Sequence, residues 1–117
     1  VKFHGFSSEI HKIMAESAIY VSSSDYEGIS NSMLEALAIG IPAVCTDCPV
    51  GGARMYIRDG ENGYLIPVGD ADVMADRMLA LMEDKKLGES FSKESVKIRE
   101  ELTDDRIFGM WKALLVR

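Results

Sequence analysis

Two carboxylates eight positions apart, Glu27 and Glu35, are the side chains in this sequence best suited to grip a ligand. Glu27 lies in a polar stretch, whereas Glu35 lies in a segment with helical spacing of apolar residues that ends at Gly40. Eight residues of helix span about 12 Å. A glycosidase needs its two carboxyl groups roughly 5–9 Å apart at one bond. This pair is therefore better placed to hold the two ends of a long ligand.

The residues between the two carboxylates favour an anionic group in the middle of that ligand. Gly28 has no Cβ, so its backbone can approach a ligand closely. Ser30, Asn31 and Ser32 place free backbone N–H groups and polar side chains at the positive end of the predicted helix. Carboxylates readily accept hydrogen bonds from vicinal hydroxyls. The layout fits a nucleotide-sugar, which has ribose and sugar hydroxyls at its ends and a diphosphate between them.

A frame of alternating strands and helices must position these residues. Short apolar runs bounded by turn residues predict strands, and apolar residues at helical spacing predict helices. Expected strands cover residues 1–3, 19–21, 43–45 and 64–66. Expected helices cover residues 8–15, 30–39, 53–57, 71–82, 86–102 and 104–116. Alternation with short links predicts one α/β domain over residues 1–117, with a Rossmann-like parallel sheet of about four strands flanked by helices.

In such a sheet, ligands bind beyond the carboxyl ends of the strands. The segments 4–6, 22–28 and 47–52 each follow a predicted strand, so we expect them to gather at one edge. Residues 59–63 have the composition of a turn, and we expect no further role for them. Trp111 is expected to anchor the last helix in the core.

Structural roles compete with the binding roles at each of these positions. Ser32 and Glu35 fit a capping box, in which Glu35 would satisfy backbone groups at a helix start. Glu27 fits a solvated turn acid. Segment 4–6 fits an ordinary exit from a strand, and Gly51–Gly52 fits a turn before a short helix.

Composition excludes several other classes of function. A formal charge of −6 argues against nucleic acid as a partner, because such binding needs a basic face. No apolar run approaches the length of a membrane span, and no signal peptide opens the sequence.

Cys45 and Cys48 form a Cys-x-x-Cys, but Pro49 and two glycines follow instead of a long helix, so we expect packing thiols and not a redox pair. A zinc site would need two further ligands, which His4 and His11 are not spaced to supply. Reduced thiols suit the cytoplasm.

The ordered motifs resemble the group 1 family of retaining glycosyltransferases, which have the GT-B fold. Glu27 begins the run Glu-Gly-Ile-Ser-Asn-Ser-Met-Leu-Glu, which matches the family's signature of two glutamates separated by seven residues. Segments 1–6, 42–47, 51–52 and 59–65 look like the family's other motifs, in the same order and at similar spacing. Together they cover most of the chain.

The resemblance assigns roles to individual residues. It makes Glu27 the catalytic residue that contacts and orients the donor sugar, and Glu35 the ligand of the ribose hydroxyls. It gives the diphosphate backbone or hydroxyl donors from Gly28, Ile29 and Ser30. The donor-binding set that it implies is Glu35, Gly28, Ile29, Ser30, Asn31, His4, Gly5, Phe6, Gly51 and Gly52, with His4, Gly5 and Phe6 beside the nucleobase and the glycine pair facing the donor.

The implied activity is transfer of a hexose from a nucleotide diphosphate sugar to an acceptor hydroxyl, with the anomeric configuration retained, as in polysaccharide biosynthesis. The resemblance implies no metal and no cofactor. It covers only the later, donor-binding part of the C-terminal lobe and ends in the C-terminal helices. We therefore expect the N-terminal lobe to be a missing part of the parent chain, through which any peripheral membrane association would occur, and we expect this fragment alone to be inactive.

Two other functions stay open. One is a non-hydrolysing nucleotide-sugar epimerase-like enzyme, whose acid and base could lie in the missing half. The other is a non-catalytic nucleotide-binding or interaction module.

Overall fold

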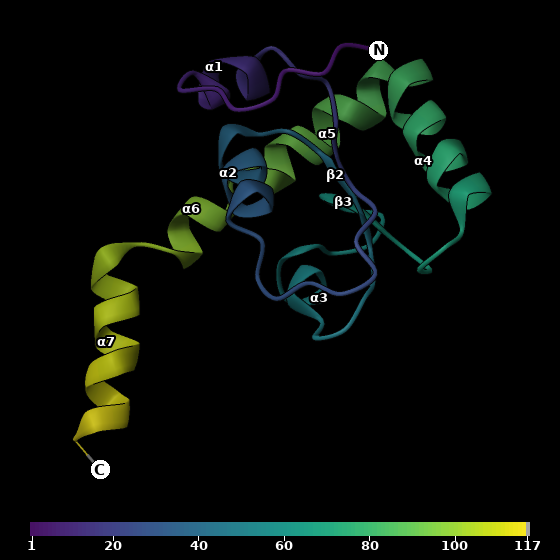
Figure 1. Ribbon diagram of the computed structural model, residues 1–117. Coiled ribbons are helices and arrows are strands. Elements are labelled where there is room, and N and C mark those ends of the chain that lie inside the picture. The colour runs from purple at the N-terminus through teal and green to yellow at the C-terminus, as the bar shows by residue number, and fades with distance from the viewer. Residues whose placement is uncertain (117) are drawn as a thin grey trace.

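A computed structural model describes residues 1–116 and contains a parallel sheet with helices on both faces (Figure 1). The sheet has the order β1 (Tyr20–Ser22), β2 (Ala43–Thr46), β3 (Gly63–Ile66). Its register places Tyr20 opposite Ala43, and Ala43 opposite Gly63. The predicted α/β fold with a flanked parallel sheet is confirmed, with three strands in place of about four.

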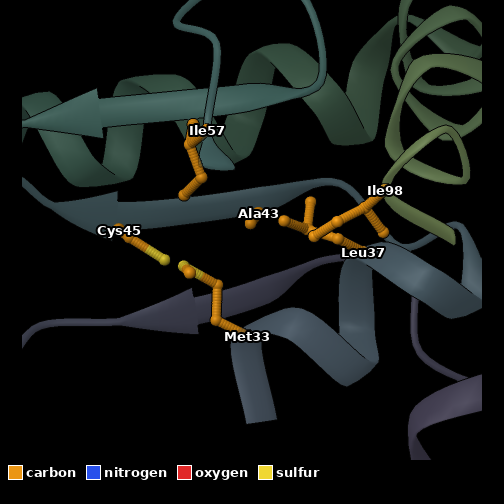
Figure 2. Packing of buried hydrophobic residues seen from close by; sticks show 6 residues of the cluster. All are labelled: Met33, Leu37, Ala43, Cys45, Ile57 and Ile98. Carbon is orange, nitrogen blue, oxygen red and sulfur yellow. The ribbon is translucent and has the colours of Figure 1, made fainter. Parts of the chain in front are cut away.

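The central strand β2 carries the core on both of its faces. All four of its residues are buried, because successive side chains point to opposite sides of the sheet and both sides are covered. Ala43 and Cys45 pack with Met33 and Leu37 of helix α2 (Asn31–Ile39), as Figure 2 shows. Val44 packs on the other face, against helices α4 (Ala71–Glu83) and α5 (Lys85–Ser95).

Helix α2 begins and ends where its sequence provides caps. The Ser30 side chain accepts a hydrogen bond from the Met33 backbone N–H at 3.3 Å, which makes Ser30 the N-cap. Gly40 ends the helix in the left-handed conformation, with φ of 97°. The capping box of Ser32 and Glu35 is therefore wrong, because the helix starts before Ser32 and places Glu35 in its second turn.

The predicted strand over residues 1–3 does not form. Val1 and Phe3 are fully exposed, and the segment pairs with neither β1 nor β3. A strand of three residues needs a neighbouring ladder to satisfy its backbone groups. Instead, the chain starts outside the sheet and leads toward helix α1 (Ile10–Ala15) (Figure 1).

The remaining helices are α3 (Gly52–Tyr56), α6 (Ile98–Glu101) and α7 (Asp104–Leu115). The predicted helix over 86–102 is split into α5 and α6 by a tight turn, in which the Arg99 N–H bonds to the Val96 carbonyl at 3.1 Å. Helix α7 projects from the rest of the chain (Figure 1). Trp111 is 60% exposed on it, so its prediction as a core anchor is wrong: no described element covers this helix.

The turn over residues 59–63 has a structural role that its composition does not reveal. The Asn62 side chain is buried; it accepts a hydrogen bond from the Arg58 N–H at 2.7 Å and donates one to the Tyr56 carbonyl at 3.0 Å. The backbone carbonyl of Asn62 also accepts a hydrogen bond from the Ser95 hydroxyl. This asparagine therefore ties the turn before β3 to helix α5.

Replacing Asn62 by Ala should lower the free energy of unfolding by about 2–3 kcal/mol, because it leaves buried backbone groups without partners. Asn31→Ala changes an exposed amide and is the matched control, with an expected change below about 0.5 kcal/mol. Urea unfolding of both variants measures the difference. Equal unfolding midpoints for the two variants would contradict the anchoring role.

Candidate functional site

The loops that follow β1 and β2 are joined by backbone hydrogen bonds at the carboxyl edge of the sheet. The Glu27 N–H donates to the Pro49 carbonyl at 2.8 Å, and the Val50 N–H donates to the Glu27 carbonyl at 2.9 Å. The Thr46 hydroxyl at the end of β2 donates to the Ser24 carbonyl at 2.5 Å. The prediction that segments 22–28 and 47–52 gather at one edge is confirmed. Glu27 consequently lies in a pair of loops that hydrogen bonds hold together.

Gly52 fixes how closely the two loops approach each other. A Cβ at Gly52 would lie 1.9 Å from the Gly28 carbonyl oxygen, so no larger residue fits there without moving the backbone. Gly51, with φ of 90°, starts α3 in the left-handed region that glycine favours. By contrast, a Cβ at Gly28 would meet nothing within 4 Å. Gly28 therefore faces open space on its Cα side, while its carbonyl group packs against Gly52.

The first turn of α2 gathers hydroxyl groups and free backbone donors. The Tyr20 hydroxyl lies 2.8 Å from Ser32 Oγ, and Ser32 Oγ lies 3.0 Å from Ser30 Oγ. Within residues 1–116, the backbone N–H groups of Asn31 and Ser32 have no hydrogen-bond acceptor, as is usual at a helix start. Unpaired N–H groups at the positive end of a helix dipole can bind an anion.

The two carboxylates lie on either side of this turn along the chain. Glu27 is exposed, and the Ser24 hydroxyl contacts its Oε2 at 3.5 Å. Glu35 follows the first residue of α2 by four positions, or about 6 Å along the axis. Its side chain is 44% exposed, and its Oε2 lies 3.3 Å from His11 Nε2. Both carboxylates are thus accessible from solvent.

The segment with His4, Gly5 and Phe6 does not join this edge. It lies near α1 in Figure 1, on the other side of the sheet region from α3. Its residues are exposed. The expectation that it would gather with the other two loops is not met, because the strand that should have directed it there does not form.

An ion pair at the same edge was missed by the sequence reasoning. Arg54 Nε donates to Asp47 Oδ1 at 3.0 Å, and its second amino group bonds to Oδ2. The hydrogen bonds and charge of Asp47 raise the pKa of the Arg54 guanidinium. No local pattern marks this pair, because its members lie on different elements and meet only when the loop folds back.

The two thiols are buried and reduced. Cys45 is 2% exposed and Cys48 is 5% exposed. Figure 2 shows the Cys45 and Met33 side chains pointing toward each other. Burial in these surroundings raises the pKa of Cys45 from 9.0 to about 12. A thiol that stays protonated is a poor nucleophile, which agrees with packing and not with redox chemistry.

The raised pKa predicts that Cys45 destabilises the fold at alkaline pH. Above pH 9 the unfolded thiol ionises while the folded thiol stays protonated, so the unfolded state gains stability until about pH 12. Between pH 8 and pH 10 the wild type should lose about 1.4 kcal/mol more unfolding free energy than Cys45→Ala. Urea unfolding at both pH values measures this difference. Parallel losses in the two proteins would show that Cys45 titrates normally.

A separate groove in the described chain does not include the two carboxylates. An open groove of about 760 Å³ lies between α4, α5 and the end of α2, and neither Glu27 nor Glu35 lines it. Within residues 1–116, no group of three or more His, Cys, Asp or Glu side chains is placed to hold a metal ion. The same residues contain no helix long and apolar enough to cross a membrane.

Comparison with known proteins links this geometry to one family. Residues 1–98 match the family model described as glycosyl transferases group 1. The chain is 35% identical over 119 residues to the putative glycosyltransferase EpsD of Bacillus subtilis, covering 98% of this chain and 31% of that protein. It is 33% identical to the poly(ribitol-phosphate) alpha-N-acetylglucosaminyltransferase of Staphylococcus aureus, covering 92% of this chain and 22% of that protein.

Solved structures of glycosyltransferases superpose on this chain as well. The crystal structure of the S. aureus TarM G117R mutant, in complex with fondaparinux, alpha-GlcNAc-glycerol and UDP, superposes with a TM-score of 0.87 at 31% identity. That match covers 95% of this chain and 22% of the TarM chain. The chain thus spans less than a third of the length of these relatives.

Proposed function

This chain belongs to the glycosyl transferases group 1 family, and from that premise we propose that it is the donor-binding part of a retaining glycosyltransferase. The full-length protein transfers a sugar from a nucleotide diphosphate sugar to an acceptor hydroxyl. The family membership confirms the resemblance seen in the motifs. We propose that the substrate is a nucleotide diphosphate sugar, that the anomeric configuration is retained, and that the parent protein has a second lobe.

One observation carries it: the hydrogen-bonded loops place Glu27 at the sheet edge directly before the unpaired N–H groups of α2. Glu35 follows those groups in the second turn. A nucleotide diphosphate sugar has charges and hydroxyls in the matching order. Its diphosphate meets the helix start, with the sugar toward Glu27 and the ribose toward Glu35.

Each group then has a chemical task. Asn31 and Ser32 donate backbone hydrogen bonds to the diphosphate, whose negative charge grows as it leaves the sugar. Gly28 lets the ligand approach the backbone because nothing occupies the space beside its Cα. Glu27 accepts hydrogen bonds from the sugar hydroxyls and orients the sugar in the transition state. No step of this scheme uses a metal or another cofactor.

The rest of the protein completes the site. A second lobe binds the acceptor and closes over the donor. We expect the first strands of the donor-binding lobe to supply cations for the diphosphate. The nucleobase contacts, assigned to His4, Gly5 and Phe6 by the motif, need the strand that residues 1–3 form only with a neighbour. We place the reaction in the cytoplasm, where nucleotide-sugars are made.

The test is a transfer assay on the full-length protein with UDP-, GDP- and ADP-sugars and a panel of hydroxyl acceptors. One donor should yield free nucleotide diphosphate and a glycoside. The coupling constant of the anomeric proton of this glycoside in proton NMR should show that the configuration is retained. The 117-residue chain alone should give no glycoside. Inverted products would refute retention, and transfer by the short chain would refute the need for a second lobe.

The same assay separates the open alternatives. An epimerase would convert one nucleotide-sugar into another without an acceptor. A binding module would bind nucleotide but release no product.

A further inference from the structure

Helix α1 lies against α2 and places His11 beside Glu35, which is in the second turn of α2. His11 is on the first turn of α1, and its Nε2 lies 3.3 Å from Glu35 Oε2. Glu27, the other carboxylate of the pair, has no ion-pair partner within residues 1–116. Of the two carboxylates, Glu35 alone therefore has an ionisable side chain beside it, whereas Glu27 has only the Ser24 hydroxyl, at 3.5 Å.

The contact leaves Glu35 able to bind a ligand. His11 Nε2 approaches Oε2, at 3.3 Å, which leaves Oε1 for a ligand. A carboxylate has about four acceptor positions on its two oxygens, so it can accept from His11 and from two ribose hydroxyls at once. A glutamate side chain that is free in solution must lose rotamer freedom when it binds, and a prior contact reduces that loss.

The histidine is not needed to hold the two helices together. Met14 makes that contact: it is buried and packs with Ala36 and Ile41. His11 is 68% exposed on its side chain, and exposed ion pairs contribute little to stability. The His11–Glu35 contact is therefore expected to contribute little to the stability of the fold.

We propose that His11 is a positioning residue for Glu35, which it holds so that the free carboxylate oxygen meets the ribose hydroxyls of the donor. The inference rests on the proposed function, because it needs Glu35 to bind ribose. It adds a residue outside the motif, on the helix that precedes β1, to the donor site.

The experiment is calorimetric titration of the full-length protein with UDP, with GDP and ADP in parallel. His11→Ala should weaken the nucleotide that binds by about threefold to tenfold, the size of one hydrogen bond. His11→Gln places an amide N–H near the same oxygen and should restore most of the affinity. Lys12→Ala, on the same exposed turn, is the matched control and should change nothing.

The double variant separates positioning from other roles. In a Glu35→Ala background, His11→Ala should have no further effect, because the side chain that His11 contacts is gone. Melting temperatures of all His11 variants should stay within about 2 °C of the wild type.

Unchanged or tighter binding by His11→Ala, with Glu35→Gln still weakened, would overturn the inference and leave the proposed function standing. If Glu35→Gln itself binds normally, the assignment of Glu35 to the ribose fails, and the role of His11 fails with it. If none of the three nucleotides binds the wild type, the proposed function is wrong.

Discussion

Glu27→Gln in the full-length protein should lower the rate of sugar transfer by about 10- to 100-fold while leaving nucleotide diphosphate affinity nearly unchanged. The free nucleotide diphosphate has no sugar for Glu27 to contact. A charged hydrogen bond that forms mainly in the transition state contributes roughly 1.5–3 kcal/mol, which sets the size of the effect. The backbone of residue 27 keeps its bonds to Pro49 and Val50, so the loop should stay in place.

The matched control is Asp25→Asn, which neutralises another exposed carboxylate of the same loop. Its transfer rate should stay within about twofold of the wild type. Steady-state kinetics and nucleotide titration on both variants distinguish a lost transition-state contact from a lost binding contact. An equal fall in rate for both variants would point to loop charge and not to a role of Glu27 in orienting the sugar.

Gly52→Ala should damage both stability and donor binding. The new Cβ would lie 1.9 Å from the Gly28 oxygen, so the two loops must separate. Overpacking of this kind costs at least about 1–3 kcal/mol, and here the clashing atom is backbone. Displacing Gly28 also moves the start of α2, so nucleotide affinity should fall about tenfold or more.

Gly109→Ala is the control for this substitution. A Cβ there would meet nothing within 4 Å, and the position lies within α7. Alanine in a helix should raise stability slightly, by about 0.5–1 kcal/mol. Thermal melting and nucleotide titration measure both effects. A Gly52→Ala protein that melts and binds like the wild type would show that the two loops are not coupled.

The features that could be predicted from the sequence are those set by residues close together in the chain. The α2 stretch is the clearest case: apolar residues at helical spacing predict the helix, and Gly40 ends it. The strand β2 was predicted almost to the residue, because a short apolar run after Pro42 is unambiguous.

What could not be predicted depends on contacts between distant segments. Residues 1–3 look like a strand, but an extended run becomes a strand only beside a partner. Gly52 looked like a donor-facing glycine, yet its missing side chain makes room for Gly28. The contact between His11 and Glu35 joins two helices whose relative placement no local pattern encodes.

The claim that the stretch from Glu27 to Glu35 grips a nucleotide-sugar at both ends is tested most directly by titrating UDP, GDP and ADP into full-length wild type and Glu35→Gln. Losing a charged acceptor for the ribose should weaken the bound nucleotide about tenfold or more. The melting temperature should be unchanged, because Ser30 and not Glu35 caps the helix. Equal affinities for wild type and Glu35→Gln would contradict the two-ended grip.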